Sequence, residues 1–298
     1  MEQGIGILIT ERLSAASVSG NVISGTLRSD PAETSEKDSL RQLPADTIVQ
    51  RIVKLLQQLE LSTPPSHIGL GMPGIIRNGI VEDSPNLVQF KGLNMQAVMA
   101  DALTPLFGKV PLSIFNDADV MAAGLAATRG HLDRLIRVWT LGTGIGFGRY
   151  PIVDGVWEAG HSVVTLDPKE QFCGCGGKGH LEGIMGHRAM RLRFMDLEPE
   201  EVFQQAEAGE ARCVEFVKLW HRALAAATAT SIHQTGQGKF FVTGFNARFV
   251  NLTLVKEYLH DMVKLSPLQA YSIEVVQGGE TVAAIGAAVN ASQAADKA

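Results

Sequence analysis

The sequence predicts an α/β protein, because apolar runs typical of strands alternate along the chain with segments of helical spacing. Two runs, "GIGILIT" at 4–10 and "HIGLGMPGII" at 67–76, are short and apolar and lead into turns, as buried strands do. Between them, "ADTIVQRIVKLLQQLE" at 45–60 repeats its apolar residues with the period of a helix. The chain has 298 residues, which is enough for two domains of ordinary size.

The first part of the chain contains the expected elements of one α/β domain. Residues 4–28 predict two paired strands with a turn near Gly20 and Asn21, and the polar, proline-containing residues 29–46 predict a loop. The same patterns then predict a helix, a strand and an alanine-rich helix, at 93–108, 110–117 and 118–130.

The second part continues the alternation. Residues 135–155 predict a strand, a glycine turn and a returning strand, and after the cysteine-containing segment 158–183 we expect helix to about residue 236. A strand leading into a loop and a short strand leading into a small-residue helix follow, at 239–249 and 271–292. We expect an N-terminal domain of residues 1–116, to which the last helix (283–298) returns, and a C-terminal domain of residues 117–282.

Composition excludes several classes of protein. The chain is 45% hydrophobic and 19% charged, and its net charge of -5 comes without a Lys/Arg-rich run, which argues against nucleic-acid binding. No apolar segment reaches the ~18 to 20 residues that span a bilayer, and the N-terminus carries an acid where a signal peptide has basic residues. Three unevenly placed cysteines make no disulfide framework. We therefore expect a cytoplasmic protein without membrane or nucleic-acid partners.

The glycine-rich segment "LGTGIGFG", residues 141–148, lies between two apolar strand-like runs. Glycines remove side chains, so backbone N–H groups there can approach a phosphate, and Thr143 can add a hydroxyl. The same pattern is also typical of a plain β-hairpin with a glycine-rich turn, and both interpretations stay open.

The segment "FNDAD" places Asn116 and Asp117 where a strand ends and a helix begins. Asp117 is a good helix N-cap, which is the simpler interpretation. The alternative is a general base, because a carboxylate at a strand end can take a proton from a hydroxyl that attacks a phosphoryl group.

The segment "EAGHSVVTLDPKEQFCGCGGKGHLEG", residues 158–183, concentrates metal-binding side chains. His161, Cys173, Cys175 and His180 offer two imidazoles and two thiolates, and zinc takes four such ligands in a closed, structural site. Two free thiols in a glycine-rich loop are the alternative. If the two histidines and two cysteines complete the zinc shell, Glu158 and Glu182 are available to accept hydrogen bonds from a polyol.

Together these segments resemble the ROK family of repressors, open-reading-frame proteins and sugar kinases. The resemblance covers nearly the whole chain, in the order "GMPG", "SPN", "FNDAD", "LGTGIGFG", "EAGH", "CGCGGKGHLE" and "AAIGAA". It implies two actin-like (ribonuclease H-like) α/β domains flanking a cleft where ATP and a hexose or hexosamine meet, and a homodimer or homotetramer.

The resemblance also implies roles for individual residues. Asp117 resembles the catalytic base that deprotonates the sugar 6-hydroxyl, with ATP and Mg²⁺ as cofactors. The implied sugar-contacting residues are Gly74, Asn86, Asn116, Glu158, His161 and Glu182. The implied nucleotide-binding residues are Gly142, Thr143, Gly144, Gly244 and Asn246.

The sequence departs from the family pattern at one ligand of the structural zinc loop. Where the family signature Cys-x-Cys-Gly-x-x-Gly-Cys-x-Glu has its third cysteine, this chain has His180. Imidazole is a good zinc ligand, so we expect a Zn²⁺ site of His161, Cys173, Cys175 and His180 that positions the sugar pocket without doing chemistry.

A second departure affects the first phosphate loop, which the family writes as Asp-x-Gly-Gly-Thr. Here Leu8 stands at the place of the Asp, and Thr10 and Glu11 stand at the two glycines. Bulky side chains there would crowd a phosphate, and the charge of Glu11 would repel it.

Three hypotheses for function follow. The leading one is an ATP-dependent kinase acting on a hexose or hexosamine. The alternative is a degenerate family member that binds a sugar as a sensor or regulator, because its first phosphate loop is lost. A DNA-binding repressor would carry an additional N-terminal helix-turn-helix domain, and we do not expect one because the chain begins at its first strand.

Overall fold

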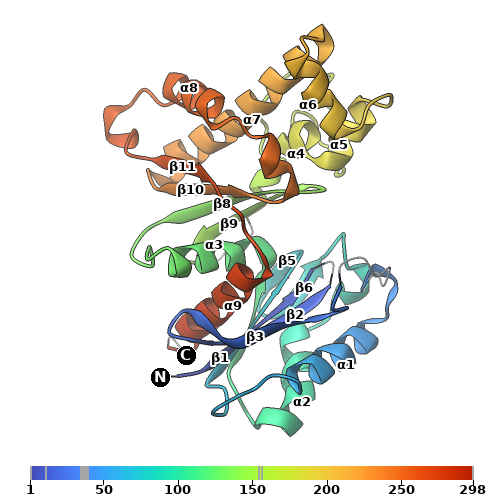
Figure 1. The fold of residues 1–298 in the computed structure, drawn as a ribbon, viewed down its shortest axis with the longest axis vertical. Helices are drawn as coiled ribbons and strands as arrows, with labels where there is room; N and C mark the ends of the chain where they lie inside the picture. Colours follow the sequence, from blue (N-terminus) through green and yellow to red (C-terminus); the bar gives the residue numbers. More distant parts are fainter. Residues whose placement is uncertain (1, 11, 34–39, 154, 156, 297–298) are drawn as a thin grey trace. The chain divides into compact units, whose positions relative to one another are not determined.

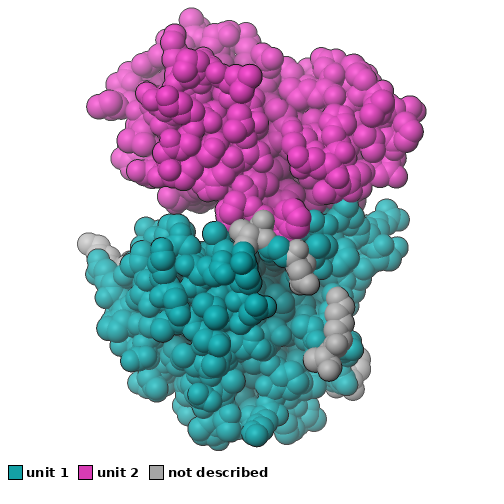
Figure 2. Space-filling model, turned by 180° about the vertical axis from the view of Figure 1, so that it is seen from behind, with its two compact units in different colours: residues 1–136, 148–156, 278–298 teal, residues 137–147, 157–277 magenta. Residues whose placement is uncertain are grey.

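The computed structural model describes residues 2–10, 12–33, 40–153, 155 and 157–296, and it confirms the α/β class (Figure 1). The repulsion expected from Glu11 concerns a residue outside this described part. The chain divides into two compact units, shown in different colours in Figure 2. Unit 1 comprises residues 1–136, 148–156 and 278–298, and unit 2 comprises residues 137–147 and 157–277.

Unit 1 contains a five-stranded sheet of order β3-β2-β1-β4-β7. Strands β1, β4 and β7 are parallel, whereas β2 and β3 add antiparallel pairs at one side. The strands are β1 Gly4–Ile9, β2 Leu13–Ser19, β3 Val22–Asp30, β4 His67–Met72 and β7 Leu112–Asn116, with a small hairpin of β5 Ile75–Arg77 and β6 Ile80–Asp83. The helices are α1 Ala45–Leu56, α2 Met95–Phe107, α3 Asp117–Thr128 and α9 Glu280–Ala295.

The two faces of this sheet bury different side chains, as the alternation along a strand requires. Ile5, Ile7 and Ile9 of β1 share one apolar cluster with residues of α1 and α2. Leu8 points to the other face and packs with Val120 of α3 and with alanines of α9. Figure 1 shows α1 and α2 together on one side of the sheet and α9 across the other.

Glycines allow α3 and α9 to pack closely in unit 1. A Cβ on Gly6 of β1 would lie 1.9 Å from the carbonyl oxygen of Ala284, and one on Gly286 of α9 would lie 1.8 Å from that of Val120. This packing places α3 in unit 1, whereas the boundary expected from the sequence falls before it, after residue 116. The last helix lies in unit 1 with the N-terminal strands.

Unit 2 is built on a four-stranded sheet of order β11-β10-β8-β9. Its strands are β8 Ile136–Leu141, β9 Ile145–Tyr150, β10 Lys239–Thr243 and β11 Ser272–Val275, where Ile136 and the end of β9 belong to unit 1. Within the fully described stretch 181–235, the single helical region expected from the sequence is divided into α4 Leu181–Met185, α5 His187–Arg193, α6 Pro199–Glu207 and α7 Ala211–Thr235. Helix α8 Leu252–Met262 follows.

The core of unit 2 forms where α7 packs on the sheet. Trp139 of β8 and Trp220 and Leu224 of α7 are fully buried in one apolar cluster. The indole N–H of Trp139 donates a hydrogen bond to Thr228 Oγ1 at 3.1 Å, so its polar atom is satisfied inside the core. Among the helices of the described residues, none combines the length and apolar character needed to cross a bilayer.

Candidate functional site

The parallel strands of unit 1 end at a common edge of the sheet. Their register places Leu8, Gly71 and Phe115 in one row, so the segments that follow β1, β4 and β7 leave the sheet side by side. In open α/β sheets, ligands bind at this carboxyl edge. The segments there contain candidate residues of the sequence analysis: Gly74, Asn116 and Asp117.

Asn116, and not Asp117, caps helix α3. Asn116 Oδ1 accepts a hydrogen bond from the Ala118 N–H at 2.8 Å, and its Nδ2 donates to the Gly74 carbonyl at 3.0 Å. Asp117 is the first residue of the helix, so the interpretation of Asp117 as the N-cap is wrong. Burial raises the pKa of Asp117, against the hydrogen bond from the Ala118 N–H. This half-buried carboxylate therefore holds its proton more firmly than an ordinary aspartate.

Gly74 occupies a position that only glycine fits. Its φ of 124° lies in the region that side chains avoid, and a Cβ would lie 2.3 Å from the carbonyl oxygen of Asp83. Asn86 is exposed, and its Oδ1 accepts a hydrogen bond from Arg41 at 3.1 Å. Gly74 and Asn116 are therefore joined directly, whereas the side chain of Asn86 is engaged with another residue.

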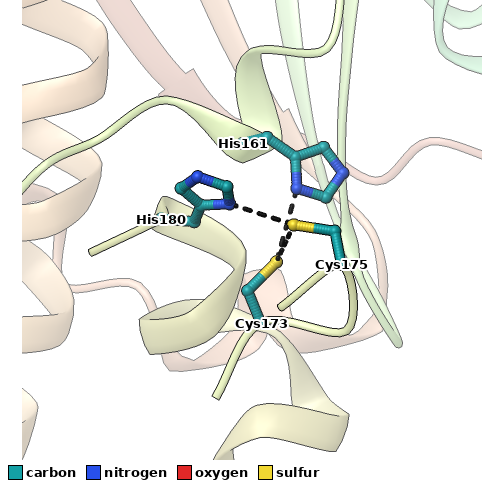
Figure 3. A group of neighbouring side chains, drawn as sticks. All are labelled: His161, Cys173, Cys175 and His180. Atoms are coloured by element: carbon teal, nitrogen blue, oxygen red, sulfur yellow. Dashed lines mark hydrogen bonds between the residues drawn. The ribbon is translucent and has the colours of Figure 1, made fainter. Parts of the chain in front are cut away.

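Unit 2 brings the four predicted metal ligands together (Figure 3). The Nδ1 of His161 lies 3.3 Å from Cys173 Sγ, the two sulfurs lie 3.4 Å apart, and the Nδ1 of His180 lies 3.3 Å from Cys175 Sγ. All four ligand atoms lie within 4.8 Å of one another. A tetrahedral zinc ion with the usual Zn–S and Zn–N lengths separates its ligands by roughly 3.5 Å, close to these values.

Glycines shape the loop that carries these ligands. Gly179 has a φ of 70°, and a Cβ there would lie 2.0 Å from the Thr165 carbonyl oxygen. A Cβ on Gly177 would collide with the ring of His180 at 2.1 Å, and one on Gly183 would lie 2.9 Å from the Cys173 nitrogen. The glycine content of this segment thus follows from its close backbone contacts.

The donor set, two thiols and two imidazoles, is one that zinc accepts, although a metal must displace a proton to bind here. Burial raises the pKa of the Cys173 thiol to about 12. The thiolate that a metal site needs therefore forms there when a cation replaces the proton. His161 Nε2 lies 4.0 Å from Glu158 Oε2, and a carboxylate on the outer nitrogen of an imidazole orients the ring toward a metal.

Glu182 connects the cysteine loop to the glycine turn between β8 and β9. It lies in α4, the helix that begins directly after His180. Its Oε1 accepts from Cys173 Sγ at 3.5 Å, and its Oε2 accepts from the Ile145 N–H at 3.2 Å. A Cβ on Gly144 would lie 2.4 Å from that same Oε2. The turn and the loop therefore share one carboxylate.

The other side of the glycine turn is held by two further segments, residues 187–188 and 244–246. The His187 N–H donates to the Gly142 carbonyl at 3.1 Å, and the Arg188 N–H donates to that of Thr143 at 3.3 Å. The fully buried Asn246 also donates to the Gly142 carbonyl, at 3.4 Å. Gly244 has a φ of 96°, which brings the end of β10 against the end of β8.

The structure adds residues that sequence reasoning missed. The rings of His187 and Phe245 pack with their centroids 5.2 Å apart, and the Nδ1 of His187 lies 3.3 Å from Asn246 Oδ1. His187 and Phe245 therefore belong to the group of residues around the glycine turn. The sequence signal that could have indicated His187 is its position directly after Gly186, the glycine between α4 and α5. At the end of β1, Arg12 pairs with Glu280 of α9, which no local pattern indicated.

The fold of this chain matches solved structures of one class of protein. A ROK hexokinase from Thermus thermophilus superimposes with a TM-score of 0.81 at 20% identity, covering 99% of this chain and 100% of that one. A ROK family glucokinase from Streptomyces griseus, solved in complex with glucose and AMPPNP, gives a TM-score of 0.69 at 19% identity, covering 98% and 99%. The two-domain actin-like ATPase fold is thus confirmed.

The family follows from sequence comparison. The ROK family model matches residues 17–294, and the chain belongs to this family. It is 30% identical over 239 residues to a glucokinase of Pyrobaculum calidifontis, covering 74% of this chain and 77% of that protein. It is 24% identical over 263 residues to an N-acetylmannosamine kinase of Haemophilus influenzae, covering 82% and 84%.

The shared carboxylate makes Gly144 the sensitive glycine of the turn. In Gly144→Ala the new methyl displaces Glu182 from the Ile145 N–H, and we expect a loss of about 1–3 kcal/mol in the free energy of unfolding, measured in urea. Gly142→Ala is the matched control, because its methyl would meet the Phe245 ring no closer than 3.6 Å, and we expect a change within about 0.5 kcal/mol. Equal losses in the two variants would contradict this geometry.

Proposed function

We propose that the protein is an ATP-dependent kinase that phosphorylates a hydroxyl of a hexose or hexosamine. Its relatives include a glucokinase and an N-acetylmannosamine kinase, and a similar fold has been solved with glucose and AMPPNP. The observation that carries the proposal is the state of Asp117. It is a half-buried carboxylate with a raised pKa at the carboxyl edge of the sheet, and the cap of its helix is provided by Asn116 instead.

A carboxylate in this state suits a general base. Its raised pKa brings its basicity nearer to that needed to accept a proton from a hydroxyl group. In the proposed reaction the sugar oxygen attacks the γ-phosphorus of ATP, the proton passes to Asp117, and ADP leaves with the bond between the γ-phosphorus and the bridging oxygen broken. Mg²⁺, when bound, neutralises charge on the phosphates.

The remaining candidate residues receive proposed roles within their own units. In unit 1 we propose Gly74, Asn86 and Asn116 as residues that contact sugar hydroxyls, and in unit 2, considered by itself, we propose this role for Glu158, His161 and Glu182. For the phosphates and nucleotide we propose the turn of Gly142, Thr143 and Gly144 together with Gly244 and Asn246. The exposure of Thr143 in the turn supports this assignment, because a ligand can reach an exposed residue.

We further propose that His161, Cys173, Cys175 and His180 hold one structural zinc ion. Four protein ligands complete a tetrahedral shell and leave no position for a reacting water. The proposed effect of the ion is mechanical, because His180 directly precedes α4, the helix that carries Glu182, and Glu182 holds the glycine turn through Ile145.

A sugar-binding sensor without efficient kinase activity is the second candidate, and one specific observation favours it. Leu8 takes the place of an acid at the end of β1, and its side chain is 1% exposed, within the apolar cluster beneath α3 and α9. A carboxylate that would help place a metal-bound nucleotide is therefore replaced by core packing at this position.

Replacing the base separates catalysis from binding. In Asp117→Asn we expect sugar-dependent ADP release to fall by about 10²- to 10⁴-fold, because the amide cannot accept the hydroxyl proton. Sugar affinity, measured by calorimetric titration, should remain nearly unchanged. Asp101→Asn, which alters an exposed aspartate on α2, is the matched control and should retain full turnover. Turnover that survives Asp117→Asn would exclude Asp117 as the base.

The raised pKa of Asp117 gives a second readout from the same variant. The folded protein binds this proton more tightly than the unfolded chain does, so ionising Asp117 reduces stability. This reduction is absent below the usual pKa of an aspartate and complete above the raised pKa. The thermal midpoint of Asp117→Asn should therefore exceed that of the wild type by a margin that grows as the pH rises through this window. A margin independent of pH would contradict the raised pKa.

The zinc proposal makes a prediction about stoichiometry. Purified protein should contain about one zinc per chain by elemental analysis, and a chelator should lower its thermal midpoint. His180→Cys should keep the metal, whereas His180→Ala should lose most of it. Cys213→Ala is the control, because Cys213 is buried in the core of unit 2 away from the ligand group. A metal-free protein that is fully folded would exclude the site.

A further inference from the structure

An arginine and a glutamate form a bidentate pair at the turn that follows β1. The Nε and Nη2 of Arg12 donate to the two carboxylate oxygens of Glu280 at 2.7 and 2.6 Å, and Nη1 donates to the Ala32 carbonyl at 2.9 Å. Glu280 is the first residue of α9, 268 positions along the chain. Hydrogen bonds from Arg12 to Glu280 raise the pKa of Arg12, so its guanidinium remains charged.

The position of the Arg12–Glu280 pair indicates a role in ligand binding. Arg12 follows the end of β1, at the same carboxyl edge as Gly74 and Asp117. The pair is not part of the buried core, because the side chain of Arg12 is 19% exposed and that of Glu280 is 25% exposed. Leu8 and Ile9, the last two residues of β1, are buried in the core, whereas Arg12 provides a cationic side chain at an edge where ligands bind.

The guanidinium group binds a carboxylate and a phosphate with the same geometry. Two parallel N–H groups of arginine match two oxygens of either anion, in the arrangement that Glu280 already occupies. A phosphate that took the place of Glu280 would exchange one anion for another and leave Arg12 paired throughout. Glu280 is partly exposed, so its carboxylate can turn to water when it is displaced.

We propose that Arg12 is a binding residue for a phosphoanhydride chain and that Glu280 is the internal anion that a phosphate group displaces. The proposal deepens the proposed function and rests on it, because it concerns how the phosphate donor is held. Its ligand is the chain of linked phosphates that ATP and inorganic polyphosphate share.

Two alternatives give different results in the same experiment. The pair could serve stability alone, as a bridge between the turn and α9. Alternatively, Glu280 could be an acid that helps to bind Mg²⁺ and nucleotide in place of the acid absent at Leu8. In the structure both oxygens of Glu280 face the guanidinium, which favours a competing anion over a metal ligand.

The test is a calorimetric titration of Glu280→Gln with the Mg²⁺ complex of a non-hydrolysable ATP analogue and, separately, with tripolyphosphate. Gln has the size of Glu and keeps one acceptor for Arg12, but it lacks the charge that competes with phosphate. If less than about a tenth of wild-type molecules have the pair open, its release should tighten binding by about tenfold. A gain with either ligand supports the proposal, and the ligand that gains identifies the phosphate donor.

Two control variants assign the gain to Arg12. The double variant Arg12→Gln/Glu280→Gln also lacks the Glu280 charge, so it should lose the gain only if Arg12 binds the phosphate. Asp30→Asn removes the acid of an equally bidentate pair in unit 1, in which Arg51 donates to both oxygens of Asp30 at 2.7 Å. This variant should leave the affinity for both ligands unchanged.

Unchanged or weaker binding in Glu280→Gln would overturn the proposal. A lowered thermal midpoint with unchanged affinity would indicate a structural bridge, and a loss confined to the Mg²⁺–nucleotide complex would make Glu280 an acid that supports metal binding. These outcomes are independent of whether the wild type phosphorylates a sugar. A failed kinase assay together with tighter phosphate binding in Glu280→Gln would reject the proposed reaction and retain the phosphate site.

Discussion

The register of three parallel strands is the constraint on which the site in unit 1 depends. Because β1, β4 and β7 pair with Leu8, Gly71 and Phe115 in one row, the segments that follow them must leave the sheet at one edge. That edge receives the proposed base, Asp117. The close packing of α9, which needs glycine in β1 and in α9 itself, then brings Glu280 to the same end of β1. Fold and site are therefore consequences of a single arrangement.

In unit 2 the arrangement of the candidate site depends on one carboxylate, that of Glu182. Glu182 accepts hydrogen bonds from Cys173 of the ligand group and from Ile145 of the glycine turn. A bound metal would take the proton of Cys173, and with it that hydrogen bond, but it would hold His180, the residue directly before α4, and so the helix that carries Glu182. The proposed metal site and the proposed phosphate site therefore lie on connected segments of one unit, and through this connection a non-catalytic ion would affect ligand binding.

The sequence could predict those features that depend on local pattern and spacing. The α/β class followed from apolar periodicity, and the spacing of His161, Cys173, Cys175 and His180 was enough to indicate a common site. The cap of α3 could not be decided, because Asn116 and Asp117 are both favoured caps and only the backbone shows which one begins the helix. The Arg12–Glu280 pair was beyond prediction, because its partners meet only through the packing of the last helix on the first strand.

The family includes kinases and regulators, and in this chain the buried Leu8 lies where the resemblance implies an acid, so phosphate transfer has to be measured. The most direct test is incubation of the protein with Mg-ATP and a panel of hexoses and hexosamines, with ³¹P NMR to follow the products. The account predicts one or more sugar phosphates, formed together with equimolar ADP and abolished in Asp117→Asn. Calorimetric binding of a sugar without any sugar phosphate at saturating Mg-ATP would contradict it and make the protein a sensor.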